Sequence, residues 1–265
     1  MSDPNDPERS VGFDRATEYY DRTRGFSPEA FDALMDVLNA ELSGRGRCLE
    51  IGVGTGLLAL ALAERGIPMT GADIARPMLD ELVAKAGGRA PFPLVQADAT
   101  RLPFRDASLG CAVFRHVLHL IPDWRGALAE LVRALGGGGR LVVVEGTFHE
   151  GAWWDLVSRF LYEAGDIPFG VGLDAREIET AHVELLSLGA RGGVVASIPD
   201  ASRETMGEFL DQMEAGMHSW TWRTREPERR RAVDAVRRWA VERYGSLDGP
   251  VSPDYRLVVR VYDLG

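Results

Sequence analysis

The sequence of 265 residues contains only two cysteines, Cys48 and Cys111, too few for a framework of disulfide bonds. Each cysteine lies in an apolar run typical of a buried strand, so both thiols are expected to be inert. No uninterrupted apolar stretch approaches the roughly 20 residues that cross a bilayer. The first ten residues are polar and rich in Asp and Pro, which is not typical of a signal peptide. These absences predict a soluble, cytoplasmic protein with no membrane partner.

Basic charge is also scarce. The 30 basic residues, of which Lys85 is the single lysine, face 40 acidic ones, so the formal net charge is −10. A nucleic-acid backbone or an anionic membrane surface would attract a basic face, and this balance disfavours both as partners. Seven arginines do cluster between residues 223 and 238, but Glu226, Glu228 and Asp234 alternate with them, as on a solvated helix face.

Motifs for nucleophilic and metal chemistry are missing as well. The sequence has no G-x-S-x-G nucleophile motif. His116 and His119 are three residues apart, whereas the zinc motif of metalloproteases places two histidines four apart around a Glu. We therefore predict no metal site.

From residue 46 onward, short apolar runs alternate with helical patterns. Strands are expected at 47–51, 69–72, 93–97, 111–114, 141–145, 193–198 and 256–262, and helices at 56–65, 76–86 and 124–135. Alternating strands and helices predict an α/β fold with a mostly parallel sheet covered by helices on both faces.

The expected domain organisation follows from this pattern. Residues 1–10 are expected to be a disordered tail, and residues 11–199 and 251–265 to form the α/β core. The segment 200–250 leaves the sheet after one strand and returns for the last, so we predict a helical cap there. Its apolar and aromatic side chains suited to a pocket are Met213, Met217, Trp220 and Trp222.

A glycine-rich loop follows the first expected strand. Gly52, Gly54 and Gly56 would let the backbone turn sharply and let a ligand approach the main chain. Asp73 ends the second strand 21 residues after Gly52, where a carboxylate can accept hydrogen bonds from ribose hydroxyls. Together with Glu50, this spacing predicts a nucleotide-like ligand.

Two other interpretations compete with this one. A dinucleotide-binding oxidoreductase has the pattern G-x-G-x-x-G, but Leu57 occupies the position of its third glycine, and Glu50 is foreign to that pattern. A glycine turn without a ligand is disfavoured because Glu50 and Asp73 accompany it. An NAD-dependent oxidoreductase stays the weaker alternative.

Residues 48–56 resemble the E/D-x-G-x-G-x-G signature of class I S-adenosylmethionine-dependent methyltransferases. Residues 73–78 and 96–104 resemble the next two segments of that family, and 115–124 and 136–144 resemble the segments around its fourth and fifth strands. The similarity is to the ubiquinone/menaquinone-biosynthesis-like branch and covers residues 13 to about 145. It implies a Rossmann-like, seven-stranded sheet with an antiparallel last strand and a helical insertion before it, and S-adenosyl-L-methionine as cofactor.

One departure from the family concerns the residues before the fourth strand. Leu109 and Gly110 stand where relatives commonly have Phe-Asp, and we expect this replacement to loosen a local hydrogen bond.

The resemblance also implies which residues bind the cofactor. They are Tyr20 and Arg24 near its carboxylate, Glu50 at its amino end, Gly52, Gly54 and Gly56 along the methionine part, Asp73 on the ribose, Ile74 and Met78 against the adenine, Asp98 and Ala99 at the adenine edge, and Arg115 or His116 beside the sulfonium.

The expected reaction is methyl transfer to a small-molecule acceptor by direct in-line displacement. A hydroxyl or amine acceptor would need a general base, for which His116 and His149 are the candidates because both follow strands at the ligand-binding edge. A carboxylate or thiolate acceptor would need no base. A cofactor-binding sensor or subunit without catalysis is the alternative, and none of these motifs encodes the oligomeric state.

Overall fold

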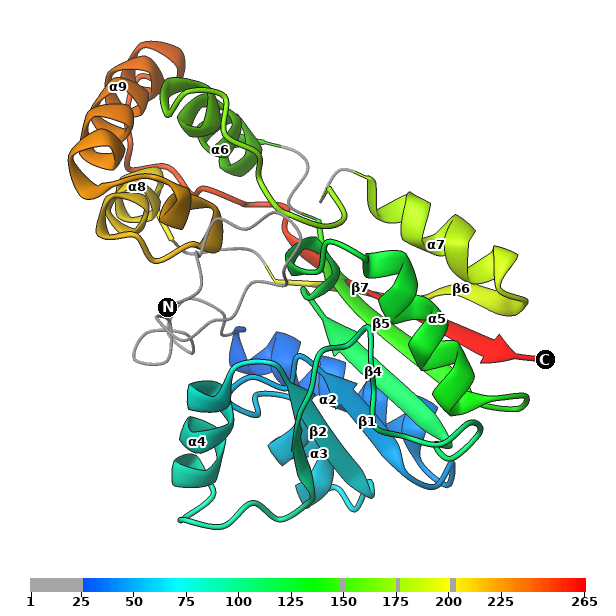
Figure 1. Cartoon of the computed structure of the whole chain (residues 1–265). Helices are drawn as coiled ribbons and strands as arrows, with labels where there is room; N and C mark the ends of the chain where they lie inside the picture. The colour runs from blue at the N-terminus through cyan, green and yellow to red at the C-terminus, as the bar shows by residue number, and fades with distance from the viewer. Residues whose placement is uncertain (1–25, 148–150, 175–176, 201–203) are drawn as a thin grey trace.

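The computed structural model describes residues 26–147, 151–174, 177–200 and 204–265, whose strands form one seven-stranded sheet (Figure 1). The strands are β1 (Cys48–Ile51), β2 (Met69–Asp73), β3 (Leu94–Gln96), β4 (Cys111–Arg115), β5 (Arg140–Gly146), β6 (Ala190–Pro199) and β7 (Arg256–Leu264). Their order is β3-β2-β1-β4-β5-β7-β6, and β7 runs antiparallel to the other six strands. The predicted Rossmann-like sheet with an antiparallel last strand is confirmed.

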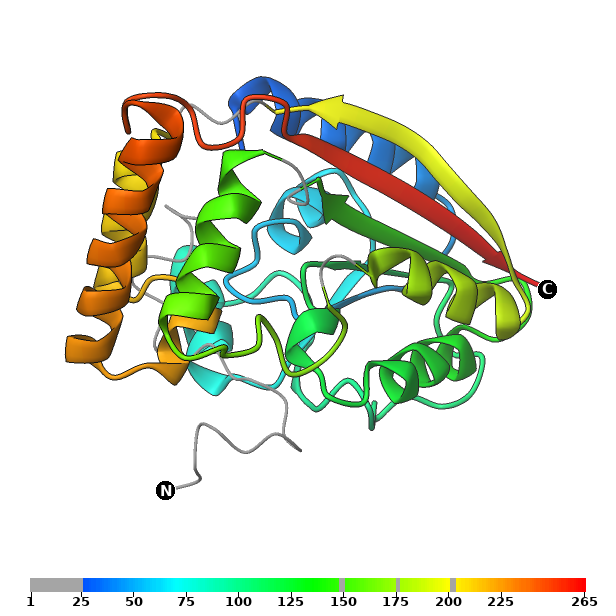
Figure 2. The same ribbon diagram turned by 90° about the horizontal axis from the view of Figure 1, so that it is seen from above.

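Helices cover both faces of this sheet, which Figure 2 shows from above. On one face lie α2 (Pro28–Leu42), α3 (Ala59–Glu64) and α4 (Arg76–Lys85), and on the other lie α5 (Trp124–Leu135) and α7 (Ile178–Ser187). Because side chains alternate along a strand, Cys48 packs into the cluster under α2 and Leu49 into the cluster under α5. All four residues of β1 are buried, as expected for a strand between two parallel neighbours.

No helix connects β3 to β4 in the described chain; an irregular segment does so instead. Leu102 and Leu109 from this segment are buried in the cluster under α5 and fill the place of a helix. Gly110 ends the segment against the backbone before β1. A Cβ at Gly110 would lie 1.4 Å from the carbonyl oxygen of Arg45, and the Gly110 amide donates to the carbonyl of Arg47 at 3.0 Å. A glycine at position 110 is what allows this contact, and the expected loosening of a hydrogen bond relative to the family stays a prediction.

Four further elements form a helical group beside the sheet, at the upper left of Figure 1. They are α6 (Ala152–Glu163), α8 (Met206–Ala215), η3 (Ser219–Arg223) and α9 (Glu226–Tyr244). They enclose a hydrophobic cluster of their own, which contains Phe160 of α6, Met213 of α8 and Trp220 of η3. The helices of the predicted cap are thus present, and α6, from the segment assigned to the core, packs with them. The cap boundaries at 200–250 stay a prediction.

None of the helices that the structure describes is both long and apolar enough to cross a bilayer.

Candidate functional site

The glycine loop lies at the carboxyl end of β1, at the edge of the sheet where β2, β4 and β5 also end. The φ angles of Gly52, Gly54 and Gly56 are 64°, 54° and 86°. Residues with a Cβ rarely adopt this left-handed backbone conformation. A Cβ at Gly52 would also lie 2.8 Å from Cγ2 of Val117, and one at Gly56 would lie 2.8 Å from Cγ of Leu82. The loop therefore needs its glycines for conformation and for close packing.

The Asp73 carboxylate joins this loop to the end of β2. Its Oδ2 accepts from the Gly54 amide at 2.9 Å, and its Oδ1 accepts from the Ala75 amide at 2.8 Å. Each carboxylate oxygen can accept more than one hydrogen bond, so a carboxylate at this position can order the loop and also bind ribose hydroxyls. Asp73 thus orders the loop and faces the position where a nucleotide-like ligand would lie.

The residues predicted to contact the adenine are close to Asp73 in the sheet, because Asp73 pairs with Gln96 of β3. Asp98 follows β3 and accepts from the amide and the hydroxyl of Thr100, at 3.0 and 2.9 Å, both through Oδ1. Oδ2 therefore has capacity for a donor from a ligand. Ile74 is half-buried, Met78 is buried, and Ala99 packs against the cluster under α5.

Two side chains of α5 fix the backbone that follows Asp98. Arg133 donates to the carbonyls of Phe104 and Leu102, at 2.9 and 3.3 Å, and Glu130 accepts from the Leu102 amide at 2.9 Å. Arg133 also donates to both carboxylate oxygens of Glu130, at 2.7 and 2.9 Å, which lowers the pKa of Glu130. This charge-assisted network compensates for the missing helix between β3 and β4.

Glu50 lies in β1 beneath the loop and is 4% exposed. Burial raises the pKa of Glu50 well above its ordinary value, although a hydrogen bond from the backbone amide of Ala59 and the charge of Arg115 both lower it. The buried Oε2 of Glu50 has no hydrogen-bond donor among the described residues. A buried acceptor without a donor fits the amino group of the predicted cofactor, and Arg115, whose guanidinium lies 4.1 Å from the Phe26 ring centroid, ends β4 next to it.

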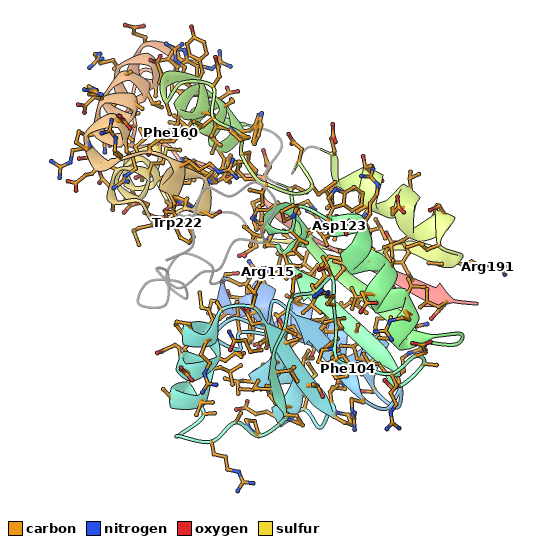
Figure 3. All side chains as sticks on the ribbon, viewed as in Figure 1. Phe104, Arg115, Asp123, Phe160, Arg191 and Trp222 are labelled. Carbon is orange, nitrogen blue, oxygen red and sulfur yellow. The ribbon has the colours of Figure 1, made fainter. Side chains whose placement is uncertain are left out.

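Figure 3 shows Arg115 at the edge of the sheet that faces the helical group. Beyond Arg115 the chain leaves β4 at His116, whose φ of 49° is unusual for a residue with a side chain. His116 lines a cavity of about 60 Å³ together with His119 and Glu145. The remaining lining is mostly apolar: Phe114, Val117, Leu118, Val144, Gly146, Leu173 and Ile178.

Glu145 is the site residue that the sequence reasoning missed. Its burial raises its pKa to about 7, against the lowering effect of Arg260. An acidic residue at the end of a buried apolar strand, at the ligand-binding edge, is the signal that could have found it.

The structure thus brings together most of the predicted residues: Glu50, Gly52, Gly54, Gly56, Asp73, Ile74, Met78, Asp98, Ala99, Arg115 and His116 all lie in or beside this edge. Tyr20, Arg24 and His149 lie outside the described residues. Within the described ranges, no group of three or more His, Cys, Asp or Glu residues could hold a metal ion.

Comparison with known proteins matches residues 49–143 to the family described as Methyltransferase domain. The chain is 34% identical to a demethylmenaquinone methyltransferase of Clavibacter sepedonicus over 51% of this chain and 57% of that protein. It is 42% identical to the protein of the same name from Thermus thermophilus, over 37% and 46%. The YcgJ protein from Bacillus subtilis has the same fold, with a TM-score of 0.61 at 18% identity, over 89% of this chain and 99% of that one.

These similarities are unevenly distributed over the chain. The chain spans about half the length of the two curated relatives, and the match to the methyltransferase domain ends within β5. The glycine loop, Asp73, Asp98 and Arg115 lie inside the match, whereas Glu145 and all helices of the helical group lie outside it. The comparisons therefore concern the cofactor half of the site.

Proposed function

We propose that the chain is a class I S-adenosylmethionine-dependent methyltransferase and that it transfers a methyl group from S-adenosyl-L-methionine to a small-molecule acceptor, since residues 49–143 match the methyltransferase domain family. The observation that carries this proposal is the bond from the Gly54 amide to Asp73, within a loop of three glycines at positive φ. The family match gives no support to an NAD-dependent oxidoreductase or to a non-catalytic sensor. The two buried free thiols support the proposed cytoplasmic location.

When bound, the cofactor supplies a methyl group activated by the positive sulfonium. Asp73 would hold the ribose, Asp98 the adenine edge and Glu50 the amino end, while the glycine loop gives backbone approach. The work of the chain is then to orient the acceptor in line with the methyl group and to exclude water. His116, which lines the cavity at the end of β4, would then face the acceptor.

Replacing Asp73 by Ala tests the proposed cofactor site. Hydrogen bonds to a charged group contribute about 1.5–3 kcal/mol each, so the affinity for S-adenosylmethionine should fall at least about tenfold. Calorimetric titration measures this affinity, and conversion of the cofactor to S-adenosylhomocysteine with a metabolite panel measures turnover by the unchanged protein. The control is Asp80→Ala, which breaks only the exposed pair with Arg76 on α4. Equal affinity in wild type and D73A would reject the site.

We also propose that the helical group forms part of the acceptor pocket. Trp222 is half-buried and lies on the side of the group that faces the sheet in Figure 3, with its indole N–H donating to the Gly216 carbonyl at 2.7 Å. Trp220, two residues earlier, is 3% exposed and belongs to the cluster inside the group. Substitution of Trp222 therefore tests a role in the pocket, and substitution of Trp220 tests a role in packing.

Trp222→Ala should lower acceptor turnover about tenfold, equivalent to roughly 1.4 kcal/mol in the barrier, while cofactor affinity and melting temperature hold nearly constant. Trp220→Ala should instead cost roughly 3–5 kcal/mol of stability, because it empties a closed cluster. Turnover assays and thermal unfolding of both variants give the comparison. If lost stability accounts for all of the lost turnover in W222A, Trp222 is a packing residue and the pocket lies elsewhere.

A further inference from the structure

Glu145 and His116 lie side by side where β4 and β5 end. Arg115 of β4 pairs with Val144 of β5 in parallel register. The residues that follow them, His116 and Glu145, are therefore neighbours at the carboxyl ends of the two strands. Both side chains line the cavity of about 60 Å³, whose walls are otherwise mostly apolar. That volume is enough for the reacting group of a ligand but not for a whole metabolite. The side chain of Glu145 is 13% exposed, so it is largely shielded from bulk water.

Arg260 of β7 holds Glu145 from the other side. Its Nε donates to Oε2 of Glu145 at 3.3 Å, and its Nη2 donates to Glu179 of α7. Glu145 makes this bond through Oε2, so Oε1 keeps its capacity to accept a proton. Because Glu179 also pairs with Arg260, the guanidinium keeps a negative partner when Glu145 becomes neutral.

The other titratable groups around Glu145 are His116 and His119 at the cavity, and Tyr262 with His182 beside Arg260. The Tyr262 hydroxyl lies 2.9 Å from Nδ1 of His182, and burial raises the pKa of Tyr262 to about 12, so it stays neutral at physiological pH. Among these neighbours, the charges that act on the pKa of Glu145 are those of Arg260, which lowers it, and Glu179, which raises it.

We propose that Glu145 takes up the proton that the methyl acceptor loses, and that the acceptor is therefore a compound with a hydroxyl or amine nucleophile. This rests on the proposed methyltransferase function. A lone pair of the acceptor oxygen or nitrogen forms the bond to the methyl carbon. The electron pair of the broken C–S bond stays on sulfur, and the O–H or N–H proton moves to the Glu145 carboxylate and from there to water.

Burial and charge give Glu145 the properties this role requires. With its pKa raised to about 7, the carboxyl group titrates near neutral pH, where a proton acceptor is most effective. It must be ionised to accept a proton, so the rate should rise with pH through about 7 and then level off. A carboxylate or thiolate acceptor carries no proton on its nucleophile, so its methylation would not need Glu145 as a base.

Carboxyl titration in protein without cofactor is the first test. In protein labelled with glutamate carrying 13C in the carboxyl group, Glu145→Gln should remove one signal that titrates near pH 7. Glu179→Gln is the matched control: it removes the other carboxylate on Arg260, which does not line the cavity. The charge of Glu179 raises the pKa of Glu145, so E179Q should keep this signal and move its midpoint to lower pH.

Methyl transfer is the second test. The acceptors are 1,4-dihydroxynaphthalene and benzylamine, which carry a proton on the nucleophile, and benzoate and thiophenol, which ionise without a base. With the faster of the first two, E145Q should lower kcat at least about a hundredfold and flatten the pH profile, at unchanged affinity for S-adenosylmethionine. E179Q should keep kcat and shift the profile to lower pH. If E145Q does not fold, Glu145→Asp, which withdraws the carboxyl by one methylene, should show the same loss.

Three results would overturn the role of Glu145: no signal that disappears in E145Q between about pH 6 and 8, a kcat of E145Q within about threefold of wild type, or turnover confined to benzoate or thiophenol. Wild-type protein that binds no S-adenosylmethionine in calorimetry would instead reject the proposed function.

Discussion

Valine in place of Gly54 should abolish cofactor binding, with a loss of affinity of at least about a hundredfold, or about 2.7 kcal/mol. The φ of 54° at Gly54 is costly for any residue with a Cβ and most of all for a branched one. The Gly54 amide also bonds to Asp73, so a displaced backbone would release the carboxylate that orders the loop. Calorimetric titration with S-adenosylmethionine gives the affinity, and circular dichroism confirms that the variant folds.

Gly66→Val is the matched control for backbone strain. Gly66 follows α3 with a φ of 85°, and a Cβ there would meet nothing within 4 Å. The control variant should lose roughly 1–2 kcal/mol of stability through strain alone and keep its cofactor affinity. A folded G54V that binds as tightly as G66V would mean that no ligand approaches the loop at Gly54.

Alanine in place of Gly110 should be the most destabilising single substitution in the sheet, with a loss of more than about 4 kcal/mol in the free energy of unfolding. Its Cβ would lie 1.4 Å from the carbonyl oxygen of Arg45, at the length of a covalent bond, so the backbone before β1 or β4 must move. That movement would break the bond from the Gly110 amide to Arg47 and shift the start of both central strands. Chemical denaturation measures the loss.

Gly193→Ala in β6 provides the comparison. A Cβ at Gly193 meets nothing within 4 Å, and the position lies in an edge strand, so the unfolding free energy should change by no more than about 0.5 kcal/mol. Should G110A prove as stable as G193A, the contact with Arg45 does not constrain the junction between β1 and β4.

Local pattern was sufficient to predict the strands of the sheet and the helices between its first five strands. The helix expected at 124–135 is observed as Trp124–Leu135, because its apolar residues recur at helical spacing and Asp123 caps its first turn. The glycine loop and Asp73 could be predicted because a strand, a turn and a second strand fix their relation within about thirty residues of sequence.

Features that depend on contacts between distant segments were harder to predict. The place of Glu145 at the end of an apolar strand could be found from the sequence, but its neighbours could not, because they depend on the register of β5 against β4 and on Arg260, more than a hundred residues later. The need for glycine at position 110 comes from a carbonyl group in a different connection of the fold. The place of α6 was missed for the same reason, since its apolar face fits a sheet as well as it fits α9.

The hydrophobic cluster enclosed by α6, α8, η3 and α9 gives the helical group a core of its own, apart from the two clusters of the sheet. The buried side chains of this cluster contact one another, whereas Val53 of the glycine loop and Ala72 beside Asp73 belong to the two clusters of the sheet. Substitutions that reshape the helical group can therefore accumulate without disturbing the half that binds the cofactor. If the helical group lines the acceptor pocket, as we propose, substitutions in these helices could change the acceptor while the proposed cofactor site stays as it is.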